Sequence, residues 1–157
     1  MRMTEKEFKE FAKSHPDLVA DKKKSSKNKF KNTVVYVYGD MPSYVRLPDK
    51  RYDLVFDSLK EYQRYCELKM LEKSGDITQL ERQKKITIQP AFKYKDEKIR
   101  EIAYRADFFY CDSNGRFIVE DVKAYDKKKQ KYLTTKDFNL KWKLLKYKYP
   151  EYDFRII

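Results

Sequence analysis

The alternation of apolar and polar residues along the chain predicts an α/β domain whose first strand begins just after residue 32. Residues 33–38, TVVYVY, are rich in β-branched and aromatic side chains and stop at Gly39, as a strand before a turn does. Residues 43–47, SYVRL, form a second candidate strand that ends before Pro48. We expect the two strands to form an antiparallel hairpin or flap at the edge of the domain.

The clearest helix is predicted for residues 58–75, SLKEYQRYCELKMLEKSG. Ser58 can cap the first turn together with Glu61, and Gly75 suits the left-handed stop at the end. Apolar residues recur at helical spacing and predict a buried stripe, which comprises Leu59, Tyr62, Cys66 and Met70.

The second half of the chain alternates strands with another helix. Strands are predicted at residues 84–92, 102–111, 116–124 and 152–157. A turn-bearing connection is expected at 92–100 and a lysine-rich loop at 125–132. A helix over residues 135–147 has an inner side formed by Phe138, Trp142, Leu145 and Tyr149. The order helix, strand, strand, strand, helix, strand predicts a mixed sheet with helices packed on its faces.

The net charge of the chain indicates that its partner is a polyanion. The sequence has 37 basic and 25 acidic residues, a formal net charge of +12, and such a field attracts phosphate backbones. The run at 21–31, DKKKSSKNKFK, is either a solvated arm or a phosphate-binding arm. We therefore expect residues 1–31 to form a basic, flexible arm and residues 32–157 to form a single domain.

Residue types argue against several other classes of protein. Cys66 and Cys111 lie far apart, without a CxxC pair, so neither a zinc site nor a disulfide framework is indicated and a cytoplasmic location is expected. His15 is the only histidine and lies in the polar leader, which argues against a histidine base. No apolar run approaches the roughly 20 residues that span a bilayer, so we expect no membrane partner.

Acidic residues inside two adjacent strands form the pattern that most needs an explanation. Carboxylates are rare in strands, yet the hairpin YRADFFYCDSNGRFIVEDVKAYD carries Asp107 in one strand and Glu120 and Asp121 in the other. If residues 113–115 form a three-residue loop, Asp107 lies opposite Asp121, and Lys123 shares their face. Glu120 then lies on the opposite face.

This register gathers two carboxylates and one amine, which suits a hard cation such as Mg²⁺ or Mn²⁺. Lys123 could orient an attacking water or stabilise charge on a phosphate. A two-residue Asn-Gly turn would instead place Asp107 opposite Val122. Another alternative is that Asp107 and Asp121 are surface acids paired with Arg105 and Lys123. The apolar neighbours on both faces of the hairpin favour the first interpretation.

The combination of Asp107, the triplet Asp121-Val122-Lys123 and Glu61 resembles the PD-(D/E)XK nuclease superfamily. The segments FDSLKEYQRYCELKMLEKSGDI, YRADFFY, VEDVK and KLLKYKYPEYDFRII resemble more closely a phage-encoded domain family of unknown function within that superfamily, over residues 29–157. The resemblance implies an α/β, restriction-endonuclease-like core similar to that of Holliday-junction resolvases. It also implies a location in the cytoplasm of a bacterial host cell.

The resemblance implies that Asp107, Asp121 and Glu61 hold the metal and that Lys123 positions or activates water. Glu120 is expected to support the site from the second strand or to form an ion pair, and Glu61 has an alternative role in the capping box. The chain departs from the family pattern in two places. Ala106 stands where proline usually precedes the first acid, and Ala124 stands where relatives more often carry glycine.

These expectations amount to a phosphodiester hydrolase, a metal-dependent DNA endonuclease selective for branched DNA such as a Holliday junction. It would act in phage recombination, replication or packaging. No segment resembles a base-reading module, so recognition by DNA shape is expected, and a homodimer would fit. Phosphate contacts are expected from a lysine set, for which a solvated surface is the alternative: Lys127, Lys128, Lys129, Lys131, Lys136 and Lys141. The competing hypothesis is a non-catalytic nucleic-acid-binding protein on the same fold.

Overall fold

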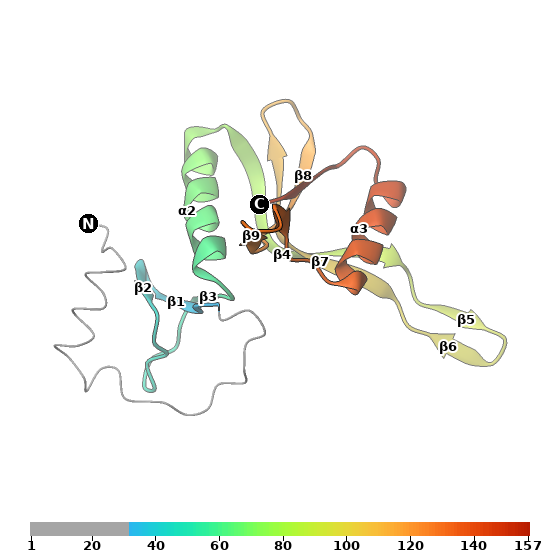
Figure 1. Cartoon of the computed structure of the whole chain (residues 1–157), viewed down its shortest axis with the longest axis horizontal. Helices are drawn as coiled ribbons and strands as arrows, with labels where there is room; N and C mark the ends of the chain where they lie inside the picture. Colours follow the sequence, from blue (N-terminus) through green and yellow to red (C-terminus); the bar gives the residue numbers. More distant parts are fainter. Residues whose placement is uncertain (1–31) are drawn as a thin grey trace. The chain divides into compact units, whose positions relative to one another are not determined.

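The computed structural model describes residues 32–157, so the expected basic arm at 1–31 lies outside the described residues. The chain divides into two units, Met1–Leu59 and Lys60–Ile157, and each is described by itself. Figure 1 labels the elements of both units. Within the part of the chain that is described, no helix is long and apolar enough to cross a membrane.

The described part of the first unit is a small antiparallel sheet. Its strands are β1 (Val35–Tyr38), β2 (Met41–Ser43) and β3 (Leu54–Phe56), in the order β2-β1-β3. β1 forms a hairpin, as expected, but its partner is β2 at residues 41–43 and not the predicted strand at 43–47; the turn between them contains Gly39, with φ +61°.

The strand predicted at residues 43–47 is wrong. The Ser43 hydroxyl donates to the Val45 carbonyl at 2.8 Å and accepts from the Val45 N–H at 3.2 Å, so the chain bends where the strand was expected to begin. The Tyr38 hydroxyl then accepts from the Leu47 N–H at 2.8 Å. The second neighbour of β1 is instead β3, which the sequence did not predict.

The second unit is built on a mixed four-stranded sheet with one helix against each face (Figure 1). The strand order is β11-β8-β7-β4, in which only β11 and β8 run parallel. Along the chain the core elements follow the predicted order: α2 (Leu59–Ser74), β4 (Ile77–Gln89), β7 (Ile102–Asp112), β8 (Phe117–Asp121), α3 (Lys136–Lys148) and β11 (Asp153–Ile156).

Two short hairpins interrupt this order. The expected connection at 92–100 contains β5 (Phe92–Tyr94) and β6 (Glu97–Ile99), and the expected lysine-rich loop contains β9 (Tyr125–Asp126) and β10 (Lys131–Tyr132). Each pair of strands is antiparallel. Both segments are therefore more regular than the sequence indicated.

The inner side of α3 is confirmed. Phe138, Trp142 and Leu145 are buried against one face of the sheet, and Tyr149 packs against the same cluster. The Thr135 hydroxyl accepts from the Phe138 N–H at 3.1 Å, which caps the first turn.

The stripe predicted for α2 is wrong in part. Leu68 is fully buried against the other face of the sheet, whereas 61% of Met70 is exposed. The face that meets the sheet also buries the carboxylate of Glu61, and Arg64 lies on it one turn later. Because polar groups occupy part of the inner face, the apolar periodicity points to a different side of the helix.

The register of the β7–β8 hairpin agrees with the three-residue loop. Phe108 pairs with Glu120 and Cys111 with Phe117, and the Asp112 N–H donates to the Arg116 carbonyl at 2.9 Å. Gly115 takes the left-handed conformation, with φ +76°. Continued by one residue, this register brings Asp107 opposite Asp121.

Candidate functional site

The candidate site lies where β7 and β8 stop pairing. The ladder ends at Phe108 and Glu120, and at the next step the Val122 N–H donates to a carboxylate oxygen of Asp107, Oδ2, at 2.8 Å. The carboxylate of Asp107 therefore takes the place of a backbone carbonyl as the acceptor where the two strands separate. We call this point the fork.

Gln83 connects Asp107 to the helix carboxylate. Its amide nitrogen lies 3.2 Å from Asp107 Oδ1 and 3.3 Å from Glu61 Oε1, so oxygens from β7 and α2 converge on one atom. Gln83 has φ +52°, a left-handed conformation that costs a non-glycine residue free energy. The strained backbone of β4 thus carries the amide that bridges two acids.

Asp121 is held from the side of the sheet that carries α3. Only 2% of the residue is exposed, and its carboxylate accepts hydrogen bonds from the Tyr104 hydroxyl and the Lys123 ammonium. The Lys123 ammonium also lies 4.8 Å from the centre of the Phe138 ring. Asp121 and Lys123 therefore act as one ion pair, while Asp107 occupies the gap between the strands.

Electrostatics join the acids into one group. Burial and the charges of Asp121 and Glu61 together raise the pKa of Asp107 to about 7, against the opposing effects of the Val122 N–H and Lys123. Burial, together with the charge of Asp121, also raises the pKa of Tyr104, so this hydroxyl stays protonated and donates. Glu61 and Asp107 also interact electrostatically with Arg82, so the three acids of the fork share two cations, Lys123 and Arg82.

Backbone bonds fix the end of β8 that carries the triplet. The Ile157 N–H donates to the Asp121 carbonyl at 3.0 Å, and the Ile157 carbonyl accepts from the Lys123 N–H at 2.9 Å. On the helix side, the Lys60 ammonium donates to the Lys123 carbonyl at 2.9 Å. The main chain of Lys123 is therefore held by two elements.

Glu120 lies on the opposite face, as the alternation predicted. It is fully buried and forms an ion pair with Arg64, whose two nitrogens donate at 2.8 and 2.7 Å. The Tyr110 hydroxyl donates to the same carboxylate at 2.6 Å. Glu120 thus anchors α2 to the sheet and takes no part in the fork.

The fork contains carboxylate oxygens, which are the ligands that a hard divalent cation prefers. These oxygens do not already surround one point as a complete set of metal ligands. Within residues 32–157, no group of three His, Cys, Asp or Glu side chains is arranged to hold a metal ion. The fork offers carboxylate oxygens and surplus negative charge, and Mg²⁺ needs only one or two carboxylates with water. The Gln83 amide and the Lys123 ammonium now occupy positions where a cation would relieve that charge.

Most of the predicted phosphate-binding lysines are exposed. The set Lys127, Lys128, Lys129, Lys131 and Lys136 lies at the surface. Lys141 is half-buried and forms an ion pair with Asp137 at 3.2 Å, so it is less available for contact with a phosphate than the exposed lysines are. The β9–β10 hairpin connects to the fork through Lys60, whose ammonium lies 5.5 Å from the centre of the Tyr132 ring.

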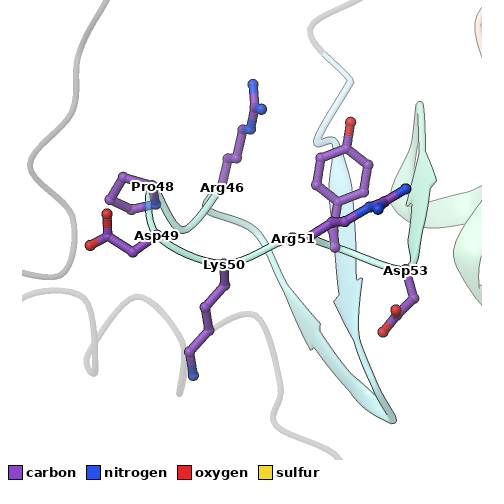
Figure 2. Close-up of a pocket in the computed structure, with 7 residues that line it drawn as sticks. Arg46, Pro48, Asp49, Lys50, Arg51 and Asp53 are labelled. Atoms are coloured by element: carbon purple, nitrogen blue, oxygen red, sulfur yellow. The ribbon is translucent and has the colours of Figure 1, made fainter.

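A second candidate, an open hollow in the first unit, does not gather its charges. Its lining is Arg46, Pro48, Asp49, Lys50, Arg51, Tyr52 and Asp53 (Figure 2). Arg46 and Lys50 point in opposite directions from the loop (Figure 2). The Arg46 guanidinium lies 5.7 Å from the centre of the Tyr52 ring, and Asp53 accepts from the Gly39 N–H at 2.6 Å. These groups do not converge on one ligand.

Sequence reasoning did not identify Gln83, Tyr104, Arg64 or Lys60. Gln83 could have been found from the register, because it is flanked by the pairs Arg82–Phe108 and Lys84–Ala106 and therefore lies opposite Asp107. Contacts from the helices and the interior, such as those of Tyr104 and Lys60, have no comparable signal in a single sequence.

Comparison with known proteins gives one family. The family described as "Protein of unknown function (DUF1064)" matches residues 50–157. No curated protein and no solved structure matches the chain. The expected resemblance to a domain family of unknown function is confirmed to that extent, from residue 50 rather than 29.

Proposed function

Since the chain belongs to the family of proteins of unknown function DUF1064, we propose its function from its own residues: a divalent-metal-dependent DNA endonuclease. One observation carries this proposal. Asp107 from β7, Asp121 from β8 and Glu61 from α2 interact electrostatically at one fork, together with Lys123. A protein that merely binds polyanions has no use for three acids in one place, because they repel phosphate.

The arrangement of elements supports a restriction-endonuclease-like core and membership of the PD-(D/E)XK superfamily. In a helix, strand, strand, strand, helix, strand order, Glu61 lies on the first helix, Asp107 and Asp121 lie on the second and third strands, and Lys123 follows the third strand by two residues. The mixed sheet, in which only the last strand pairs in parallel, is compatible with that core.

In this proposal Asp107 and Asp121, with Glu61, hold Mg²⁺ or Mn²⁺. The bound ion supplies electrostatic stabilisation for a phosphodiester under attack by water. Tyr104 orients Asp121 by donating to it, and Gln83 keeps Glu61 and Asp107 close together. These contacts would orient the carboxylates toward a bound cation.

Lys123 has the role of a local cation. Its ammonium binds Asp121 in the absence of metal and can turn to a phosphate oxygen or to the attacking water when the charge of Asp121 is taken up by another cation. Its main chain is held on both sides, so only the side chain needs to move.

The substrate side of the proposal rests on charge. The exposed lysines of the β9–β10 hairpin follow the fork directly in the chain and suit contacts with the phosphate backbone. Recognition of branched DNA such as a four-way junction, by shape, is the selectivity we propose, and a homodimer would match the symmetry of such a junction. The setting proposed is the DNA metabolism of a phage in the cytoplasm of its host.

The test is a cleavage assay on supercoiled, linear and four-way-junction DNA with Mg²⁺, Mn²⁺ or EDTA. We expect cutting with either metal, none in EDTA, and preference for the junction. Asp121→Asn should lower the rate at least about 100-fold, since it removes a charge that the reaction uses.

Glu151→Gln is the matched control, because Glu151 is an exposed acid between α3 and β11, outside both the fork and the lysine hairpin. It should cut at the rate of the parent. Cutting by Asp121→Asn at the parent's rate, or cutting in EDTA, would overturn the proposal.

A second candidate function is a non-catalytic nucleic-acid-binding protein. The observation that favours it is that, in residues 32–157, no three potential ligands already form a metal shell, while Lys123 occupies Asp121. Tight binding of all three DNAs without cutting under any metal would select this alternative.

A further inference from the structure

The β5–β6 hairpin is a two-stranded ribbon that leaves the sheet. It continues the paired strands β4 and β7 and extends beyond α3, away from the rest of the unit (Figure 1). All of its strand residues except Ile99 are exposed, including two aromatic rings, Phe92 at 45% and Tyr94 at 58%. A ribbon of two strands gains little stability by itself, so exposed rings on it need a reason.

The two faces of the ribbon differ in chemistry. Phe92 pairs with Ile99 and Tyr94 with Glu97, and because side chains alternate, these four residues share one face. The other face carries the directly opposed pair Lys93 and Lys98. One face is thus aromatic and the other cationic.

The cationic face is unfavourable in the protein alone. Like charges directly opposite one another on adjacent strands repel and destabilise the pairing. With Lys95 at the turn and Arg100 after the second strand, residues 93–100 carry four positive charges against two negative ones, Asp96 and Glu97. The Lys95 ammonium lies 5.6 Å from the centre of the Tyr94 ring, so a cation also stands beside the aromatic face. A polyanion with exposed flat rings could stack on the aromatic face and neutralise the lysines of the cationic face.

We propose that the β5–β6 ribbon binds DNA whose bases are unstacked, with Phe92 and Tyr94 stacking on bases and Lys93 and Lys98 contacting phosphates. Stacking needs open base faces, which single strands and branch points offer and the interior of a duplex does not. The inference rests on the nucleic-acid part of the proposed function and is independent of its catalytic part.

The ribbon contacts its DNA at a distance from the fork. Ile99 lies eight positions before Asp107 along nearly continuous strands β6 and β7, which at about 3.3 Å per residue spans about 26 Å. At about 3.4 Å per base pair this length equals about eight base pairs. A DNA molecule that lies along β6 and β7 would therefore meet the ribbon about eight base pairs from the fork.

The experiment measures DNA binding in EDTA by fluorescence anisotropy, so that no cleavage intervenes. The probes are a single strand of about 30 nucleotides, a duplex of about 30 base pairs and a four-way junction. For Phe92→Ala/Tyr94→Ala we expect affinity for the single strand and the junction to fall at least about 10-fold, with less than about 3-fold loss for the duplex. Lys93→Ala/Lys98→Ala should weaken binding to all three and lower the salt dependence by about two phosphate contacts.

Lys69→Ala/Lys73→Ala is the matched control, because it removes the same charge from the exposed side of α2 and should leave the selectivity unchanged. Circular dichroism checks that every variant is folded. If the parent binds all three DNAs and the ribbon variants bind like the control, the ribbon inference is wrong while the proposed function stands. If the parent binds none of them, both are wrong. Equal losses on duplex and junction for Phe92→Ala/Tyr94→Ala would also overturn the stacking role.

Discussion

Glu120 and Asp121 are neighbours on β8 and are both buried, yet their surroundings differ in charge. Glu120 faces α2, where Arg64 donates two hydrogen bonds to it and Tyr110 a third. The bond to Glu120 in turn raises the pKa of Arg64. Asp121 faces the other side and pairs with Lys123, and the three acids of the fork share Lys123 and Arg82. Glu120 is balanced by its own guanidinium, whereas Asp121 belongs to a group in which three acids share two cations.

The difference separates a structural acid from a functional one. A buried carboxylate with a matched guanidinium and a hydroxyl joins a helix to a sheet and needs nothing further. Carboxylates that repel one another inside a protein lower its stability, and they are tolerated where a ligand relieves the repulsion. The comparison can be tested by removing charge from each side in turn.

The largest effect is expected on the balanced side. Arg64→Ala leaves Glu120 buried without its cation, and we expect the free energy of unfolding to fall by about 3–5 kcal/mol in urea denaturation. Arg116→Ala is the control, because Arg116 is exposed and its pair with Asp112 is long, at 3.8 Å; it should cost less than about 1 kcal/mol. Equal losses for the two variants would show that Glu120 is not held as described.

A smaller effect of opposite sign is expected at the fork. In EDTA at pH 8, Asp107→Asn should raise the free energy of unfolding by about 1 kcal/mol, because it removes one of the repelling charges.

The pH dependence of Asp107 follows from its pKa, about 7 in the folded protein against an ordinary 3.8. Between these values the folded protein keeps a proton that the unfolded chain has lost, so stability from this group falls as pH rises. The advantage of Asp107→Asn should therefore grow from pH 5 to pH 8, as measured by thermal denaturation. An advantage that is constant with pH would contradict the raised pKa.

The smallest effect distinguishes the backbone of Gln83 from its side chain. Gln79 and Gln83 both have positive φ, +57° and +52°, so glycine relieves strain at each. Gln79→Gly should stabilise the protein by about 0.5–1 kcal/mol. Gln83→Gly gains the same relief but removes the amide between Glu61 and Asp107, so its net gain should be smaller by about 1 kcal/mol in the same denaturation assay. Identical gains would mean that the bridge contributes nothing.

The elements that local sequence determines were predictable. Gly115 fixes the turn, the turn fixes the register, and the register brings Asp107 to Asp121. The inner side of α3 followed from its apolar spacing, because nothing polar interrupts that side.

Features that depend on distant contacts were not predictable. Ser43 bends the chain through its own hydroxyl, a choice that a strand-like composition does not reveal. The inner face of α2 carries Glu61 and Arg64 because their partners lie on β4 and β8, far along the sequence. Periodicity measures apolar burial, so it misplaced Met70 where buried charges form part of the interface.

The single tryptophan has a practical consequence. Trp142 is buried with its ring centre 5.7 Å from that of Tyr104, and the hydroxyl of Tyr104 donates to Asp121. Any cation that draws Asp121 away from this hydroxyl also changes the surroundings of the indole. The chain therefore carries a built-in optical reporter, and its emission spectrum can follow loading of the fork without a label.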